Sequence, residues 1–307
     1  MLIVVNANAR GGRGHGRWPK VRAALEAEGV AFDACETQSA AEARERVLEA
    51  WAQGERRFVA AGGDGTVNAL ASLLVEQGAG AELGAIGLGS SNDFHKPVER
   101  AHTLANCPAR LGPAQPADVG VARYLDPQGQ AQLGHFLINA SLGATATANG
   151  RFNQAGPGLR ALKRVHVELA ILACAGQALL GLRALPLRLT RDGGSSALLP
   201  TTNLAVLKRV HVAGGMRYDT PVALDDGLLA VNWIGDVGRW QLVRTIVNLY
   251  RGRFTATPGT ASWLARTLTV ESPTPTWLEL DGEVLRASRV EFSVREAGVQ
   301  LCAPGWE

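Results

Sequence analysis

The order of apolar segments changes near Asp118, and this change most limits what the chain can fold into. Before that point, apolar segments of strand length alternate with segments of helical spacing. This alternation predicts a parallel sheet whose strands are joined by helical crossovers. The expected strands are Leu2–Asn6, Ala31–Thr37, Phe58–Ala61 and Leu83–Leu88, and the expected helices are Pro19–Glu28, Ser39–Gln53 and Thr66–Gln77.

After Asp118 the chain changes to short apolar segments, most of them separated by glycine and proline turns. This pattern is typical of antiparallel sheets and predicts a β-sandwich, interrupted by helices near Leu159–Leu182 and Trp240–Arg251. With 307 residues the chain is long enough for two domains, which we place at 1–122 and 123–294. The expected sandwich strands are Phe136–Ala140, Leu185–Thr190, Thr202–Leu207, Leu228–Ile234, Leu268–Glu271, Trp277–Leu280, Val290–Val294 and Val299–Cys302.

Composition excludes several classes of protein. The chain is 46% hydrophobic and 19% charged, which supplies a core and excludes a disordered chain. Its four cysteines lie far apart without a CxxC pair, which argues against a zinc site or a disulfide framework and favours a reducing, cytoplasmic location. The apolar residues 1–5 lack the basic region of a signal peptide, and the longest apolar stretch, Leu169–Leu182, is too short to cross a membrane.

The strongest local signal is the segment from Phe58 to Asn68, FVAAGGDGTVN. An apolar strand leads into a helix through three glycines, Asp64 and Thr66. Glycines let backbone N–H groups approach a bulky anion, and the helix N-terminus adds positive potential. Asp64 lies where a phosphate-bound Mg²⁺ would be held, because a bare carboxylate would repel phosphate. A strand-to-helix turn capped by Asp64 is the alternative interpretation.

A second polar loop, GLGSSNDF, follows the expected strand Leu83–Leu88. Its hydroxyl at Ser90 suits a phosphate oxygen, and its carboxylate at Asp93 suits a metal or a ribose. Two such loops at the carboxyl ends of neighbouring parallel strands would face one crevice, where open α/β sheets bind ligands. A polar β-turn is the alternative. The chain has no Walker A, HExxH or GxSxG motif, which argues against a P-loop NTPase and the common hydrolase classes.

These motifs together resemble the diacylglycerol kinase catalytic family, which includes bacterial lipid kinases and sphingosine kinases and is related to NAD kinases. The resemblance extends over nearly the whole chain and implies an α/β ATP-binding domain, a C-terminal β-sandwich, and a chain end, about 295–307, that returns to the first domain. It rests on GGDGT at 62–66 with Asn68, GSSNDF at 89–94, PVALDDGLL at 221–229 and LDGE at 280–283.

The resemblance also implies roles for single residues. Glu283 is the expected general base, with Asp64 and Asp281 as further catalytic residues. The carbonyls of Ala223 and Leu228 and the carboxylate of Asp226 are expected to hold a structural Mg²⁺. Without the resemblance, the Asp-Gly pairs at 226–227 and 281–282 would be interpreted as β-turns. The residues expected on ATP are Asn6, Thr37, Gly62, Gly63, Asp64, Gly65, Thr66, Asn68, Gly89, Ser90, Asn92 and Asp93.

Several positions depart from the family pattern. Ala69 stands where the family has a glutamate after the asparagine of GGDGTxN. In the second loop, Gly87 replaces a proline, and Ser90 and Ser91 replace Thr-Gly. Ser90 keeps the hydroxyl, whereas Ser91 adds a Cβ that needs a negative φ. These departures leave open a catalytically silent protein that binds nucleotide or lipid.

The acceptor side is basic. Ten basic and two acidic residues lie between Arg151 and Arg217, an excess that suggests a surface for anions. The helix expected near Trp240–Arg251 has Trp240, Val243, Val247 and Tyr250 or Ile246 on one face, bordered by Arg239, Arg244, Arg251 and Arg253. Such a helix suits an anionic bilayer, and packing of its apolar face on the sandwich is the alternative. Nucleic acid is not an expected partner, because the basic residues are not interleaved with aromatic ones.

The sequence therefore predicts an ATP- and Mg²⁺-dependent lipid kinase that phosphorylates a hydroxyl of a diacylglycerol-like lipid. It is expected to be cytoplasmic and to touch the membrane surface transiently. A kinase of a soluble acceptor such as NAD is the alternative within the same class. A homodimer is left open, because pairing at sheet edges leaves no clear signature in a sequence.

Overall fold

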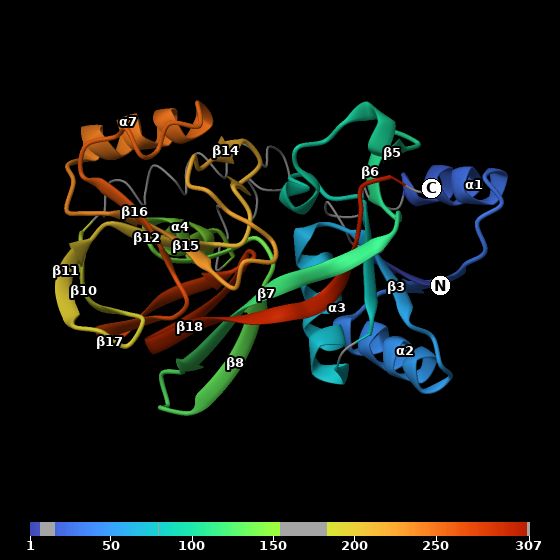
Figure 1. The fold of residues 1–307 in the computed structure, drawn as a ribbon, viewed down its shortest axis with the longest axis horizontal. Coiled ribbons are helices and arrows are strands. Elements are labelled where there is room, and N and C mark those ends of the chain that lie inside the picture. The colour runs from blue at the N-terminus through green and yellow to red at the C-terminus, as the bar shows by residue number, and fades with distance from the viewer. Residues whose placement is uncertain (7–15, 79, 154–182, 306–307) are drawn as a thin grey trace.

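A computed structural model describes residues 1–6, 16–78, 80–153 and 183–305 of the chain (Figure 1). The helix expected near Leu159–Leu182 lies outside these residues. The described residues form an α/β part with a parallel sheet and a mainly antiparallel β part, which confirms the predicted fold class.

The N-terminal half is the parallel α/β structure that alternating strands and helices predict. Its strands are β1 (Leu2–Asn6), β2 (Asp33–Thr37), β3 (Arg57–Gly62) and β4 (Glu82–Gly87), and its helices are α1 (Trp18–Ala27), α2 (Ala40–Ala52) and α3 (Asp64–Gln77). Neighbouring strands pair in parallel in the order β2–β1–β3–β4. Ser39 caps α2, since its Oγ accepts a hydrogen bond from the Glu42 N–H at 3.2 Å. Apolar side chains such as Ile3, Phe58 and Leu83 are fully buried along these strands.

A short irregular connection leads from β4 to the second half. It contains two 3-10 turns, η1 and η2, and the strand β6 pairs antiparallel to the edge of β4. The elements are η1 (Asp93–His95), η2 (Arg100–His102), β5 (Thr103–Leu104) and β6 (Cys107–Arg110).

The C-terminal half is built mainly of antiparallel strands around a second apolar core. Phe136 and Phe292 lie at its centre, fully buried and in edge-to-face contact at 6.1 Å between ring centroids. The elements are β7 (Ala114–Leu125), β8 (Ala131–Phe136), β9 (Asn139–Gly143), α4 (Ala144–Asn153), β10 (Leu185–Arg191), β11 (Ser196–Thr201), β12 (Asn203–Leu207), β13 (His211–Val212), β14 (Met216–Arg217), β15 (Leu229–Ile234), α7 (Arg239–Tyr250), β16 (Thr260–Ala265), β17 (Leu268–Leu280) and β18 (Glu283–Cys302).

Several expected strands differ from the structure. The segments 268–271 and 277–280 belong to one strand, β17, because a register irregularity between Glu271 and Thr276 lets it continue past the prolines. The segments 290–294 and 299–302 likewise belong to β18, which continues through a shift between Arg295 and Val299. The expected strand 136–140 is divided between β8 and β9. Strands β7, β11 and β16 were not predicted, since their polar and small residues do not form apolar runs.

Strand β18 connects the two halves. It pairs antiparallel with β17 and β7 in the sandwich and then runs parallel to β4, with Gln300 opposite Glu82 and Leu301 opposite Leu83. Figure 1 shows this long red strand crossing from the sandwich to the N-terminal sheet. The chain end therefore lies against the first half, where the N–H of Leu111 donates to the carbonyl of Gly305.

Replacing Phe292 by Ala tests the sandwich core. We expect Phe292→Ala to lower the free energy of unfolding by about 3–5 kcal/mol, because a fully buried ring leaves a cavity in a packed core. Urea unfolding measures the loss. Leu133→Ala is the control, since the Leu133 side chain is 56% exposed and its loss should be within about 0.5 kcal/mol. Equal stability of the two variants would contradict this core assignment.

Candidate active site

The two glycine-rich loops meet at the carboxyl ends of β3 and β4. Gly62 and Gly87 are paired across these strands, and the N–H groups of Leu88 and Gly89 both donate to the Gly62 carbonyl. A Cβ on Gly89 would lie 2.6 Å from the Cα of Gly63, which is closer than atoms pack. The glycine at 89 is therefore required by the contact between the loops.

Gly65 differs from its neighbours. A Cβ at this position would meet no atom of the protein within 4 Å, and its φ is outside the left-handed region. The fold therefore does not require a glycine at 65. The open space in front of its backbone, at the start of α3, is where a phosphate group would approach.

Residues from β1 and β2 complete the same edge of the sheet. The Asn6 Nδ2 donates to the Thr66 Oγ1 at 3.0 Å, and the buried Thr37 hydroxyl donates to the Val5 carbonyl at 3.3 Å. The residues expected on ATP from four strands thus lie at one edge, as the alignment of parallel strand ends predicts.

Asp64 ties the first loop to the second. One carboxylate oxygen accepts the Phe94 N–H at 3.0 Å. Burial, with a smaller contribution from the charge of Asp93, raises the pKa of Asp64. A nearby cation would stabilise the charged form of such a buried carboxylate. The buried Oδ1 of Asn68, which accepts no hydrogen bond from the described residues, would offer a second oxygen. These donors fit a phosphate-bound Mg²⁺.

Asp93 is bonded to groups of both halves of the protein. Its buried carboxylate accepts hydrogen bonds from Ser91 Oγ at 2.6 Å, from the Lys96 ammonium at 2.6 Å and from the Gly214 N–H at 2.9 Å. Gly214 lies in the β13–β14 hairpin of the second half. Asp93 therefore joins the second loop to the sandwich, and direct contact with nucleotide stays a prediction.

Two details of the second loop explain how its backbone accommodates the residues that depart from the family pattern. Ser91 has no positive φ, so its Cβ is accommodated. Asn92 takes the left-handed conformation instead, with φ of 49°, and its Nδ2 donates to the Gly87 carbonyl at 3.3 Å. The loop thus closes without a glycine at 91.

The Asp281–Gly282 turn joins β17 to β18, and both residues have positive φ (46° and 90°). The Asp281 carboxylate accepts the N–H groups of Leu137, Ile138 and Asn139 at 2.6, 3.0 and 2.8 Å. Burial raises its pKa to about 7 despite these bonds. Asp281 therefore anchors the turn, and a direct part in catalysis stays a prediction.

A second buried carboxylate, that of Glu279, also forms a hydrogen bond with this turn. Glu279 accepts hydrogen bonds from the Asn139 Nδ2, the Ser141 hydroxyl and the Gly282 N–H. Burial raises its pKa. Sequence reasoning missed Glu279, because its two side-chain partners, Asn139 and Ser141, lie about 140 residues away in the chain.

Glu283 follows the anchored turn and is exposed. Together with the start of α3, it borders a cleft of about 530 Å³ between the two halves. The cavity thus brings the expected general base together with Gly65 and Asn68, while Gly62, Gly63, Asp64 and Thr66 of the GGDGT segment do not line it. The lining residues are Gly65, Asn68, Ala69, Ser72, Asp281, Gly282 and Glu283.

Buried positive groups lie near this region. Arg209 lies over the Phe94 ring, 4.3 Å from its centroid, and Arg110 lies 5.6 Å from the same ring. Burial and the charge of Arg110 lower the pKa of Arg209 to about 9, while the charges of Asp281 and Asp64 act in the opposite direction. Neither arginine belongs to a motif, although Arg209 lies in the basic stretch between Arg151 and Arg217. Their positive potential favours an anion near the loops.

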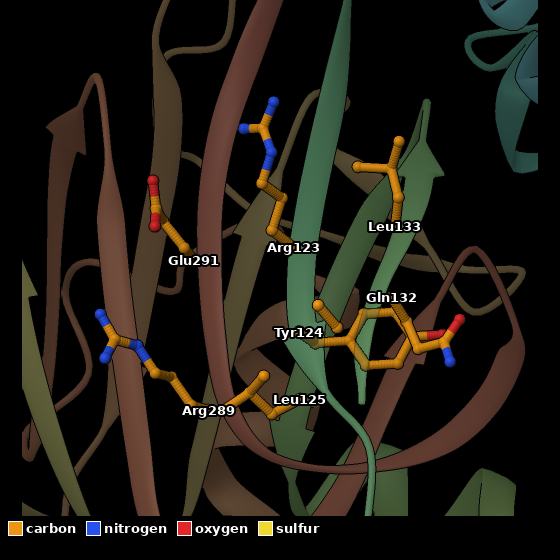
Figure 2. A pocket seen from close by; sticks show the side chains of 8 residues that line it. Arg123, Tyr124, Leu125, Gln132, Leu133, Arg289 and Glu291 are labelled. Carbon is orange, nitrogen blue, oxygen red and sulfur yellow. The ribbon is translucent and has the colours of Figure 1, made fainter. Parts of the chain in front are cut away.

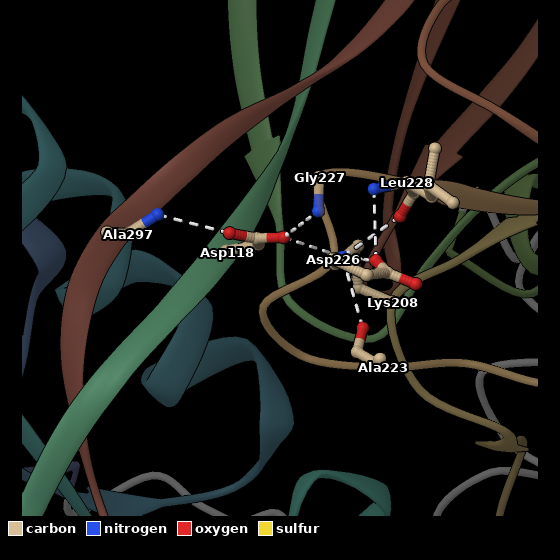
Figure 3. A network of polar contacts seen from close by, with 7 residues as sticks. All are labelled: Asp118, Lys208, Ala223, Asp226, Gly227, Leu228 and Ala297. Carbon is tan, nitrogen blue, oxygen red and sulfur yellow. Dashed lines mark hydrogen bonds and ion pairs between the residues drawn. The ribbon is translucent and has the colours of Figure 1, made fainter.

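The expected structural metal site contains an ammonium group. The oxygens of Ala223, Asp226 and Leu228 converge as predicted, but they surround the Nζ of Lys208 (Figure 3). A divalent cation would need the same oxygens at shorter distances. The residues present therefore do not fit the Mg²⁺ expected at this position.

A second pocket, of about 450 Å³, lies on the sandwich where β7, β8 and β18 form one sheet (Figure 2). Arg123, Tyr124 and Leu133 line it together with Arg289 and Glu291. None of the predicted site residues belongs to this pocket. The cleft beside Glu283 is therefore the better candidate for the reaction.

Comparison with known proteins agrees with this geometry. Residues 1–122 match the diacylglycerol kinase catalytic domain, and residues 140–303 match the YegS C-terminal NAD kinase beta sandwich-like domain. The chain belongs to this family of lipid kinases. The predicted family and the predicted enzyme class, a phosphotransferase, are confirmed at that level.

Relatives of this lipid kinase match over most of its length. A protein of Pseudomonas putida named probable lipid kinase YegS-like is 28% identical over 91% of this chain and 88% of its own. A protein of the same name from Xanthomonas euvesicatoria is 29% identical over 92% and 89%. A diacylglycerol kinase from Bacillus anthracis has the same fold, with a TM-score of 0.66, 18% identity, and 98% and 96% of the two chains covered. In the described part of the chain, no helix is long and apolar enough to span a bilayer.

Replacing Gly89 by Ala tests the contact between the loops. We expect Gly89→Ala to lower the free energy of unfolding by about 1–3 kcal/mol, because the added methyl group forces the two backbones apart. Gly65→Ala is the matched control and should change stability by no more than about 0.5 kcal/mol. Chemical denaturation compares them, and equal stability of the two variants would show that the loops do not touch as described.

Proposed function

We propose that this lipid kinase transfers the γ-phosphoryl group of ATP to a hydroxyl of a diacylglycerol-like lipid. The observation that carries the proposal is the shared cleft, which the exposed Glu283 lines together with Gly65 and Asn68 from the start of α3. Phosphoryl transfer depends mainly on positioning and charge neutralisation, and both are available at this place.

Groups in the cleft and at the adjoining N-terminus of α3 divide the tasks of this reaction. The backbone at Gly63 and Gly65 and the N-terminus of α3 would bind the phosphates. Asp64, with Asn68, would hold the Mg²⁺ that neutralises charge on the transferred phosphoryl group. Glu283 would take the proton from the acceptor hydroxyl. Two buried carboxylates fix the turn that carries Glu283, so the base keeps a defined place.

Replacing Glu283 by Gln separates binding from transfer. We expect Glu283→Gln to lower the rate of lipid phosphorylation by about 10²–10⁴-fold, because an amide cannot accept the proton. The affinity for Mg·ATP should stay within about twofold of the wild type, since no loss of phosphate contacts is expected. Labelled-ATP transfer and calorimetry measure the two quantities.

Glu291→Gln is the control for this experiment. Glu291 lies on the same strand, β18, but lines the pocket away from the cleft. This variant should keep wild-type activity. Full activity of Glu283→Gln would show that Glu283 is not the base. That result would not contradict the proposed nucleotide site.

The acceptor is proposed to arrive from an anionic bilayer that contacts α7. The helix buries Leu242, Thr245 and Leu249 against the sandwich, so the apolar residues of its opposite face are left uncovered. Trp240 is 87% exposed and Tyr250 is 60% exposed, with Val243 and Val247 between them. The helix thus packs on the sandwich, but not through the apolar face that the alternative interpretation expected to be buried.

Charge favours a bilayer as the occupant of this face. The exposed side chains of Arg244, Arg251 and Arg253 border the apolar residues. Exposed tryptophan and tyrosine with adjacent arginine suit the boundary of an anionic lipid layer. Tyr250 also lies against Gly215, next to the Gly214 that bonds Asp93. The helix is therefore coupled to the nucleotide loop through one hairpin.

Replacing Trp240 and Tyr250 by Ala tests this surface. We expect the double variant to bind vesicles of phosphatidylglycerol and phosphatidylcholine at least about tenfold more weakly, because two large apolar side chains leave the interface. Flotation measures binding. Leu198→Ala is the control, because Leu198 is 59% exposed on β11, away from α7. Unchanged vesicle binding of the double variant would place membrane contact elsewhere.

A further inference from the structure

We propose that the ammonium group of Lys208 replaces a divalent cation in the sandwich, so that the fold of this lipid kinase does not depend on metal at this site. The Nζ lies 2.9 Å from the Leu228 carbonyl and 3.2 Å from the Ala223 carbonyl. It also lies 3.3 Å from an Asp118 oxygen and 3.6 Å from an Asp226 oxygen (Figure 3). The inference does not rest on the proposed function.

The ammonium is fully enclosed. Lys208 directly follows β12 and is 0% exposed, and its backbone N–H donates to the Ile138 carbonyl at 2.9 Å. A buried cation is tolerated only where oxygens surround it. Two carbonyl groups and two carboxylates supply these oxygens. The two carboxylates carry one more negative charge than the lysine needs to be balanced.

The same oxygens organise three parts of the fold. The Asp118 carboxylate, on β7, accepts the Gly227 N–H at 2.8 Å and the Ala297 N–H at 3.1 Å. Ala297 lies in the irregular stretch of β18 between Arg295 and Val299. Gly227 lies in the loop that supplies both carbonyls. Lys208 therefore stabilises the junction of β7, the 223–228 loop and the bend of β18.

Lysine and a divalent cation exclude each other at this place. Mg²⁺ binds oxygens at about 2.0–2.1 Å and Ca²⁺ at about 2.3–2.6 Å, so either ion would occupy the position of the Nζ. A divalent ion beside the ammonium would also be repelled by it in a buried environment. A tethered ammonium is always present, whereas a bound ion contributes only at sufficient concentration.

Thermal unfolding of nucleotide-free protein tests the inference. The wild-type Tm should change by less than about 1 °C between EDTA and 5 mM Mg²⁺ or Ca²⁺, as expected for a protein without a linked metal site. Lys208→Ala should lower the Tm by about 10 °C in EDTA, because two carboxylates lose their cation. Ca²⁺ or Mg²⁺ should then raise the Tm of Lys208→Ala with increasing concentration, because the cavity admits an ion.

Two further variants make the outcome specific. Lys208→Met should lose stability as well but gain nothing from either ion, since its side chain fills the space. Asp64→Asn combined with Lys208→Ala should keep the response to ions, which separates this site from the cleft. A wild-type Tm that falls in EDTA and recovers with Mg²⁺ or Ca²⁺ would overturn the proposal. Equal responses of the Ala and Met variants would also overturn it.

Discussion

The long strand β18 fixes how the two halves of this lipid kinase face each other. It starts at the Asp281–Gly282 turn, forms part of the sandwich between β17 and β7, and ends beside β4 in the N-terminal half. The cleft therefore lies between parts of one hydrogen-bonded network. Because Glu283 is the first residue of β18, the position of the proposed base is linked to the sheet that carries the two glycine-rich loops.

Buried carboxylates do much of the positioning in this molecule. Asp281 and Glu279 hold the turn before Glu283, Asp93 joins the second loop to the sandwich, and Asp118 links β7 to the bend of β18. Each of them is bonded to backbone N–H groups, which fixes loops that have no regular pairing of their own. The turn that Asp281 and Glu279 hold carries the exposed Glu283, the proposed base.

The sequence predicted the parts that depend on local pattern. Strand and helix alternation identified the parallel sheet, and the glycines before Asp64 and Ser90 identified the two loops that meet at its edge. Contacts between distant segments were not predictable in this way. Lys208 and Asp118 are separated by 90 residues, and neither belongs to a motif. The helical period placed Trp240 and Tyr250 on one face of α7, but only packing decides which face is buried.

The central claim is that this chain phosphorylates a lipid hydroxyl, and one assay tests it directly. Purified protein, γ-labelled ATP and Mg²⁺ would be incubated with a lipid extract in mixed micelles and, separately, with water-soluble alcohols that include NAD. We expect label in a chromatographically resolved lipid and none in the soluble acceptors. Label in a soluble acceptor alone, or ATP binding without transfer to any acceptor, would contradict it.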